Sequence, residues 1–553
     1  MNLNLNFQIN TGSLTKLKEK LSFMSAEKWV VTISIVLAFS ATAYYFATDA
    51  IVAYGDAESH LNIAKRVVHS LTPGFAQLGG IWLPLPHILL LPLVYFNSLW
   101  RSGLAGSIIS GIAFVISSLY IYKLTFHISK NKVGSIFAAL VFMLNLNILY
   151  LQATPMTELP LIVFFILSTY YFVRFLDDES RIINLLLAAF FGFCATLSRY
   201  DGWFLVGVEA VILFLKYLPM SWKNLSWRNV FTGKIFNFRS WGKAEGMLIL
   251  FGTLAFFGIV LWLTWDFLIL GDPLYFTHSQ FSAKSQQQGW LGKGQLPAYQ
   301  NLPLSLLYYA VTMMSTLGLV VFTVAFIGFF VYLFKQPQVG KFFVGGLLVS
   351  TFFFYVITLY LGQSIIFIPH LTPPNFEATL FNVRYGVMMV PFAAVFFGYF
   401  VSRIRTAALA LVVALFAFQF ILYGIGYSQV LSYEDGQRGL SQSKRPDAER
   451  FLAEHYDNGL ILLDDYSRLV SIIRADVPME NVIYVGNKPY WEESLEAPEK
   501  HAKWIVVQKN DEIWNHIYAP EYMQGRLYKY FEKVYTSPEI LIFKRNENVS
   551  VQN

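Results

Sequence analysis

Long apolar runs recur along most of the chain, separated by shorter polar segments. Eleven runs approach or exceed the roughly 20 residues that a helix needs to cross the hydrocarbon core of a bilayer. They cover residues 29–47, 104–124, 133–150, 159–175, 182–197, 203–218, 247–270, 304–334, 342–361, 383–401 and 406–427. The pattern predicts a polytopic α-helical membrane protein with about eleven transmembrane helices.

One further apolar stretch differs from these runs. Residues 81–100, IWLPLPHILLLPLVYFNSLW, carry Pro84, Pro86 and Pro92. Proline removes a backbone donor and clashes with the preceding helical turn, so we expect a broken element that lies along the membrane interface. It belongs to a loop, residues 49–103, between the first two predicted spans.

The pattern changes after the last span. From about residue 428, short β-branched runs such as GLILLDD, NVIYVG, KWIVVQ and ILIFKR alternate with helical patterns such as PDAERFLAEHY. This alternation predicts a small α/β domain with a partly parallel sheet over residues 428–553. The remaining chain divides into an N-terminal segment, residues 1–28, and a transmembrane domain, residues 29–427.

Composition agrees with this division. Of 553 residues, 55% are hydrophobic, 17% are aromatic and only 14% are charged, which excludes a soluble enzyme. The single cysteine, Cys194, lies inside an apolar run, so neither a disulfide framework nor a thiolate metal site is expected. No glycine-rich nucleotide fingerprint is present, and nothing in the pattern predicts a nucleic-acid partner.

The distribution of lysine and arginine predicts the orientation. With the N-terminus inside, 19 of the lysine and arginine residues before residue 428 fall in the inner segments, including the N-terminal segment, and 7 fall in the outer loops. The positive-inside rule selects this arrangement. We therefore expect a multi-pass protein of the cytoplasmic (inner) membrane, with a cytoplasmic N-terminus and, after an odd number of spans, an extracytoplasmic C-terminal domain.

This topology gathers ionisable residues from separate segments on the outer face. They are Asp56, Glu58, His60, Glu158, Arg199, Asp201, Asp272, His278, Lys284, Lys293, His370, Glu377 and Arg384, with Tyr200 and Tyr385 beside the arginines. The motif GDAESH, taken alone, is also explained as a solvated connection. Charge beside hydrocarbon is costly, however, and its convergence on one leaflet predicts a functional site.

The residue types narrow the chemistry. Carboxylates suit a general base or an oxygen-liganded metal, while Arg199 and Arg384 offer forked donors that match phosphate oxygens. This combination at a membrane surface indicates transfer from a lipid-linked phosphate. His60, His278 and His370 are candidate ligands for a divalent metal, although three histidines from separate loops make a poor ligand motif.

The order of four motifs resembles the GT-C superfamily of polyprenyl-phosphate-sugar-dependent glycosyltransferases. These motifs are GDAESH after the first span, WLPLPH, TPMTELP and RYGVMMVP. Protein O-mannosyltransferases and the bacterial aminoarabinose transferases of lipid A are the most similar in pattern. The resemblance covers roughly residues 29–427, and it is carried by the order and sidedness of the motifs, each of which is weak alone.

The resemblance implies roles at matching positions. Asp56 would be the catalytic base for an inverting attack on the anomeric carbon, Glu158 a second acid near the acceptor or a metal, and Arg384, with Tyr385, a donor-phosphate ligand. Arg199 and Asp201 would be polar residues of the same site. We add Glu58 as a catalytic candidate, Arg199 as a phosphate ligand, and His60, Asp201, His278, Lys284 and His370 as substrate-binding candidates.

Two departures from the family pattern matter. Many relatives have adjacent Asp and Glu in the first loop, but here Ala57 separates Asp56 from Glu58, which places the two about 200° apart on a helix. There is also no Trp-Trp-Asp sequence, which favours a single-sugar transferase over an oligosaccharyltransferase.

Other functional classes stay open at this stage. A transporter or flippase of a lipid-linked anion is the main alternative, although charges within the predicted spans are few, with Glu209 and Asp266 the main exceptions. A scaffold for envelope assembly is a third possibility. The sequence does not specify the sugar, the acceptor (protein, lipid or glycan), the need for a metal, the role of the C-terminal domain or the oligomeric state.

Overall fold

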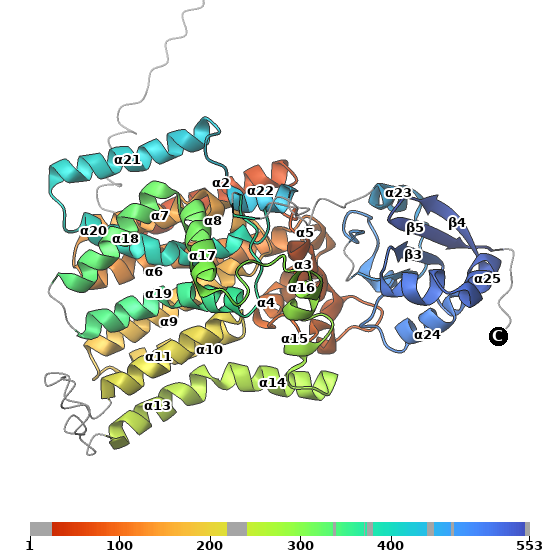
Figure 1. The fold of residues 1–553 in the computed structure, drawn as a ribbon, viewed down its shortest axis with the longest axis horizontal. Helices are drawn as coiled ribbons and strands as arrows, with labels where there is room; N and C mark the ends of the chain where they lie inside the picture. Colours follow the sequence, from red (N-terminus) through yellow and green to blue (C-terminus); the bar gives the residue numbers. More distant parts are fainter. Residues whose placement is uncertain are drawn as a thin grey trace, which may run out of the picture.

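The computed structural model describes residues 25–217, 241–335, 339–369, 371–372, 380–438, 447–465 and 469–547. Figure 1 shows a bundle of helices joined to a smaller part that contains a β-sheet. Most of the long bundle helices run roughly along one direction, whereas α17 crosses it, and the sheet part lies beyond one end of the bundle (Figure 1).

The helices that precede the sheet part are of very different lengths. They are α2 (Ala26–Ala47), α3 (Gly55–Val68), η1 (Phe75–Leu78), α4 (Leu85–Val94), α5 (Asn97–Arg101), α6 (Leu104–Ser129), α7 (Lys132–Met143), α8 (Leu146–Leu151), α9 (Glu158–Asp177), α10 (Ile182–Thr196), α11 (Asp201–Tyr217), α13 (Trp241–Ala255), α14 (Phe257–Leu270), α15 (Tyr275–His278), α16 (Ala283–Gly292), α17 (Leu302–Leu317), α18 (Leu319–Phe334), α19 (Val339–Tyr360), η4 (Val383–Met389), α20 (Val390–Val401), α21 (Thr406–Gly424) and α22 (Leu431–Arg438).

Six of the described helices are long and apolar enough to cross a membrane singly. They are Ala26–Ala47, Leu104–Ser129, Glu158–Asp177, Gly340–Tyr360, Val383–Val401 and Thr406–Gly424. Two further pairs of helices pass the same test together, with bends of 44° between α13 and α14 and of 115° between α17 and α18. The protein is therefore an integral membrane protein, but the count of eleven spans is not confirmed.

Three of the predicted spans contain a break. Residues 247–270 bend between α13 and α14, and residues 304–334 bend sharply at Gly318, whose φ of 78° is left-handed. Residues 133–150 break after α7, where the Asn145 side chain accepts a hydrogen bond from Ile148 N and starts α8. Hydropathy alone does not register such breaks.

Amide side chains bind the backbone groups that these breaks leave free. The Nδ2 atoms of Asn145 and Asn147 both donate to the carbonyl of Thr316, at 2.9 and 3.0 Å, and Nε2 of Gln419 donates to the carbonyl of Leu317 at 3.0 Å. Water is scarce inside a membrane, so each free carbonyl there needs a partner from the protein.

The proline-rich stretch forms two short helices, α4 and α5. Pro92 lies inside α4 and is exposed, whereas Pro86, His87, Leu90 and Val94 of the same helix are buried. Together with α3 and the α15–α16 loop, these helices lie at the end of the bundle nearest the sheet part (Figure 1). The predicted loop between the first two spans is therefore a folded layer rather than a simple connection.

The sheet part has five strands in the order β2-β1-β3-β5-β4. Strands β1 (Ile461–Leu463), β2 (Val482–Ile483) and β3 (Trp504–Gln508) are parallel, whereas β5 (Ile540–Arg545) pairs antiparallel with β3 and with β4 (Phe531–Thr536). The helices of this part are α23 (Ala448–His455), η5 (Met479–Asn481), α24 (Tyr490–Glu496), η6 (Pro498–Lys500), η7 (Trp514–Tyr518) and α25 (Glu521–Tyr530). The predicted C-terminal α/β part with a partly parallel sheet is confirmed.

Helix α20 is at the centre of the bundle, with every residue except Phe400 buried. It approaches its neighbours through glycine. A Cβ at Gly398 would lie 2.3 Å from the carbonyl oxygen of Gly134 in α7, and a Cβ at Gly328 in α18 would lie 2.1 Å from the carbonyl oxygen of Phe396. Small residues allow helices in a membrane to pack backbone against backbone.

We predict that Gly398→Ala destabilises the bundle by about 2 kcal/mol, because the added methyl has no space and α7 must move away. Thermal unfolding of the purified protein in detergent measures the effect. Gly246→Ala is the control, since a Cβ at Gly246 meets nothing within 4 Å. Equal melting temperatures for the two variants would contradict the close packing.

Candidate functional site

The loop between the first two predicted spans supplies a helix that carries an acid on each of two faces. Helix α3 begins at Gly55, and Asp56 and Glu58 lie in its first turn, where carboxylates interact favourably with the helix dipole. Asp56 is the more accessible of the two, with 24% of its side chain exposed, whereas Glu58 is buried. The two residues take part in different contacts.

Asp56 meets an arginine from a distant part of the chain. The Nη2 atom of Arg384, at the start of η4, lies 2.6 Å from Oδ2 of Asp56, and its Nε lies 3.2 Å from Oε1 of Glu158. Glu158 is the first residue of α9 and is fully buried. One guanidinium thus joins helix α3 to the start of two membrane helices.

A second arginine binds the same glutamate. Nη1 of Arg199 lies 3.3 Å from Oε1 of Glu158 and donates to Oγ1 of Thr157 at 2.9 Å. Its Nε lies 3.4 Å from Oδ2 of Asp201, and its Nη2 donates to the hydroxyl of Tyr355 at 3.2 Å. The two guanidiniums therefore share one carboxylate oxygen, and we call Asp56, Glu158, Arg199, Asp201 and Arg384 the acid–guanidinium cluster.

Tyrosine rings surround the cluster. The Arg384 guanidinium lies 4.8 Å from the ring centroid of Tyr54 and 5.2 Å from that of Tyr385, and Tyr385 stacks on Tyr355 at 5.1 Å. Ring faces attract cations and exclude water from one side of each guanidinium. The tyrosines hold the arginine forks in place without adding another charge.

Sequence analysis missed one acid beneath the cluster. Asp435 in α22 is buried, and its Oδ2 accepts a hydrogen bond from the hydroxyl of Tyr54 at 3.1 Å; that hydroxyl also donates to the carbonyl of Ser432 at 2.7 Å. Burial raises the pKa of Asp435 to about 6, although the positive charge of Arg384 acts in the opposite direction. The sequence placed Asp435 in the C-terminal domain, and only the fold brings it under Arg384.

Charge within this region is not balanced. Two guanidiniums face the three carboxyl groups of Asp56, Glu158 and Asp201, with Asp435 as a fourth nearby. An arriving phosphate would have to compete with a carboxylate for Arg384. Among the carboxylates paired with these arginines, Asp56 is the most exposed and so the one that a ligand reaches most easily.

Other predicted site residues lie apart from the cluster. Oε1 of Glu58 accepts a hydrogen bond from the backbone N–H of Ile473, at 3.4 Å, on the side of α3 that faces the sheet part. His278 pairs with Asp272 at 2.6 Å on an exposed loop, and Lys284 is exposed on α16. His370 and Glu377 lie outside the described residues.

His60 lies one turn after Asp56 along α3. Its Nδ1 atom is 2.9 Å from Nε2 of His87 in α4, and its ring centroid is 4.7 Å from that of Trp82. Both histidines are buried, while Trp82 is half-buried. The proline-rich stretch thus supplies the partners of His60.

A preformed metal site is not found in the described part of the chain. No group of three or more His, Cys, Asp or Glu side chains there is placed to hold a metal ion. The oxygen atoms of Asp56 and Glu158 that face the arginines are occupied by ion pairs. Of the three histidines suggested as metal ligands, His60 and His278 belong to no such group among the described residues, and His370 lies outside them.

A family model matches part of the chain, and several solved structures share its fold. A family model described as dolichyl-phosphate-mannose-protein mannosyltransferase matches residues 96–234, which is less than half of the chain. The comparison with curated proteins found no match.

Solved structures similar to the chain cover nearly all of it. ArnT from Cupriavidus metallidurans bound to undecaprenyl phosphate is 10% identical to this chain, with a TM-score of 0.57. The match covers 96% of this chain and 100% of the ArnT chain. The apo form of the same protein is 10% identical, with a TM-score of 0.51, and the match covers 91% of this chain and 97% of the ArnT chain. The oligosaccharyltransferase of Archaeoglobus fulgidus in complex with Zn and sulfate is 11% identical, with a TM-score of 0.49. The match covers 93% of this chain and 73% of that protein. The GT-C resemblance drawn from the sequence is confirmed at the level of the fold.

We predict that Arg384→Gln lowers the free energy of unfolding by about 3 kcal/mol, because it leaves a buried carboxylate short of positive charge. Adding Glu158→Gln to the same chain should recover part of that loss, since it removes the excess negative charge. Thermal unfolding of the two single variants and the double variant measures the coupling. Simple additivity of the two substitutions would contradict the shared ion pair.

We predict a pH-dependent effect of Asp435→Asn. The folded pKa of about 6 exceeds the ordinary value of 3.8, so the folded protein keeps a proton that the unfolded chain loses, and stability falls as the pH rises from about 4 to about 6. The asparagine variant lacks this titration. The melting temperature of the variant, relative to that of the wild type, should rise between about pH 4 and pH 6 and level off above pH 6. A difference in melting temperature that does not change with pH would show that Asp435 is not buried as described.

Proposed function

We propose that the protein is a membrane glycosyltransferase that moves a sugar from a polyprenyl-phosphate donor to an acceptor on the outer face of the cytoplasmic membrane. The observation that carries the proposal is the ion pair between the accessible Asp56 and the buried Arg384, in a cluster at the end of the bundle nearest the sheet part. The GT-C fold, the family match over residues 96–234, and the ArnT structure bound to undecaprenyl phosphate support the donor class.

The two arginines of the cluster have different roles in this proposal. Arg384 binds the donor phosphate with its forked N–H groups, and Arg199 keeps Glu158 in place behind it. Since Arg384 already pairs with Asp56, the incoming phosphate displaces that carboxylate. Donor binding would thus release Asp56 from its ion pair and raise its basicity at the moment when a base is needed.

In the transfer step, the acceptor replaces the polyprenyl phosphate on the sugar. Asp56 takes the proton from an acceptor O–H or N–H group, and the acceptor atom forms a bond to the anomeric carbon. The bond between that carbon and the phosphate oxygen breaks on the opposite side, and its electron pair leaves with the polyprenyl phosphate. The configuration at the anomeric carbon inverts.

The sidedness of the proposal depends on the lysine and arginine distribution together with the fold. The acid–guanidinium cluster lies near α3, at the end of the bundle that also faces the sheet part, and the positive-inside rule assigns that end to the outer leaflet. The C-terminal part, residues 428–553, would then be extracytoplasmic and well placed to meet an acceptor. The sugar and the acceptor are not assigned.

We predict that Asp56→Asn lowers kcat for sugar transfer by about 10³-fold, because a general base contributes on that scale. The assay uses the full-length purified protein, a panel of polyprenyl-phosphate sugars and release of polyprenyl phosphate as the readout, with and without a chelator. Asp49→Asn is the matched control: Asp49 is exposed, lies in the same segment and is outside the cluster.

Three results would contradict this assignment. Full activity of Asp56→Asn would remove Asp56 from the mechanism, and loss of activity in Glu58→Gln alone would place the base on the other side of α3. Absence of turnover with every donor, combined with movement of a lipid-linked anion across vesicles, would favour the transporter.

A further inference from the structure

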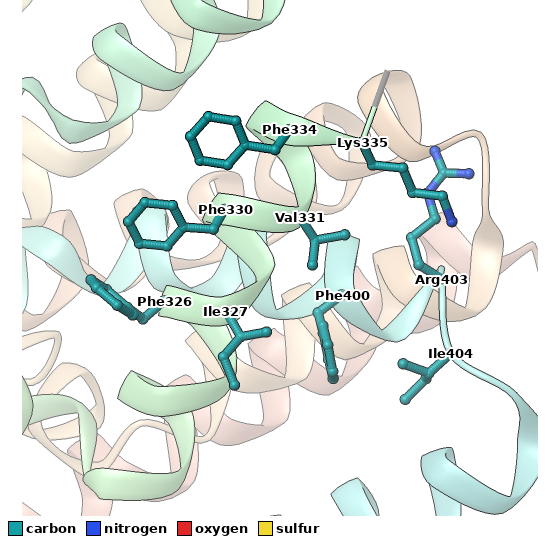
Figure 2. Close-up of a pocket in the computed structure, with 9 residues that line it drawn as sticks. All are labelled: Phe326, Ile327, Phe330, Val331, Phe334, Lys335, Phe400, Arg403 and Ile404. Atoms are coloured by element: carbon teal, nitrogen blue, oxygen red, sulfur yellow. The ribbon is translucent and has the colours of Figure 1, made fainter. Parts of the chain in front are cut away.

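A second candidate site lies on α18 and the end of α20, away from the acid–guanidinium cluster. The pocket has a cavity volume of about 670 Å³. Its lining is apolar except at one edge, where Lys335 and Arg403 contribute their side chains (Figure 2). No acidic residue lines it within the described part of the chain.

The apolar wall is a stripe of aromatic side chains. Phe326, Phe330 and Phe334 recur at every fourth position of α18, so they share one face of the helix. They are 51%, 40% and 61% exposed, and the rings of neighbouring members are 4.8 and 5.9 Å apart. In a membrane helix, such a surface meets hydrocarbon chains.

The cationic edge is not neutralised by the described residues. Lys335 is the C-cap of α18, and Arg403 follows α20, where its guanidinium lies 4.9 Å from the ring centroid of Tyr399. Both residues are exposed, and neither forms an ion pair with a described carboxylate. Lys341 lies beside this edge, with its Nζ donating to the carbonyl of Lys335 at 2.8 Å. This edge is complementary to an anion.

The pocket is far from the cluster that contains Arg384. Helix α20 contributes 12 residues and η4 contributes 7 between the two sites, which gives a separation of about 30 Å from the usual rise per residue. That length matches the hydrocarbon thickness of a bilayer. A ligand here occupies the opposite leaflet and cannot be the donor phosphate held by Arg384.

We propose that this pocket binds an anionic diacyl phospholipid of the inner leaflet. Lys335 and Arg403 bind the phosphate, and the acyl chains lie along the phenylalanine stripe and over Phe400 and Ile404 (Figure 2). A small soluble anion would leave the apolar wall exposed, while a zwitterionic lipid would bring its own cation to the cationic edge. Two basic residues at a membrane surface contribute enough to select an anionic headgroup.

The experiment measures lipid binding to the full-length protein in neutral detergent by native mass spectrometry. Phosphatidylglycerol and phosphatidylcholine with the same acyl chains are titrated separately, and glycerol phosphate serves as the headgroup without chains. We expect tighter binding of phosphatidylglycerol and roughly 30-fold weaker binding after Lys335→Gln/Arg403→Gln, since each cation contributes about a factor of five. Transfer activity does not enter the measurement, so this test and that of the proposed function fail independently.

Two variants separate charge from shape. Lys130→Gln/Lys132→Gln removes two exposed cations at the same end of the bundle but outside the pocket lining, and should leave binding unchanged. Val331→Trp keeps both cations and fills the pocket, and should abolish retention of the lipid. Equal affinity for the two phospholipids, equal loss in the control, or binding of glycerol phosphate as strong as that of the lipid would each overturn the proposal.

Discussion

The ion pairs of Arg384 with Asp56 and Glu158 constrain the rest of the membrane part. A charged group buried among apolar helices is stable only when it is paired and hydrogen-bonded. Here one guanidinium joins α3 to α9, and Arg199 extends the pairing to the start of α11. Segments far apart in the chain are therefore held at one end of the bundle by charge, and the same pairing determines which carboxylate remains accessible.

The breaks in the helices serve this arrangement. The 115° bend between α17 and α18 and the break between α7 and α8 meet where Asn145 and Asn147 bind the carbonyl of Thr316. Asn147 also accepts a hydrogen bond from the backbone of Ser432 at 2.9 Å, at the start of the segment that carries Asp435. Asn147 therefore links the break at Thr316 to the segment that places Asp435 under Arg384.

Helix α3 connects the cluster to the sheet part. Asp56 faces Arg384, whereas Glu58 accepts from the backbone of Ile473, and Arg66 binds Asp465 and lies over the ring of Tyr484 at 3.8 Å. A rigid helix with contacts on both sides transmits a displacement of either partner to the other. Movement of the sheet part would therefore displace Asp56 as well.

The sequence by itself determined the membrane class, the sheet-containing C-terminal part and the candidate arginines and acids, because these follow from hydropathy, strand pattern and residue type. It also identified that Asp56 and Glu58 point in different directions, since helical geometry requires this. Only the tertiary structure decided that Arg384 joins Asp56 to Glu158, that the spans are broken, and that Asp435 belongs to the site. Those features depend on contacts between residues hundreds of positions apart, and local patterns carry no information about such pairings.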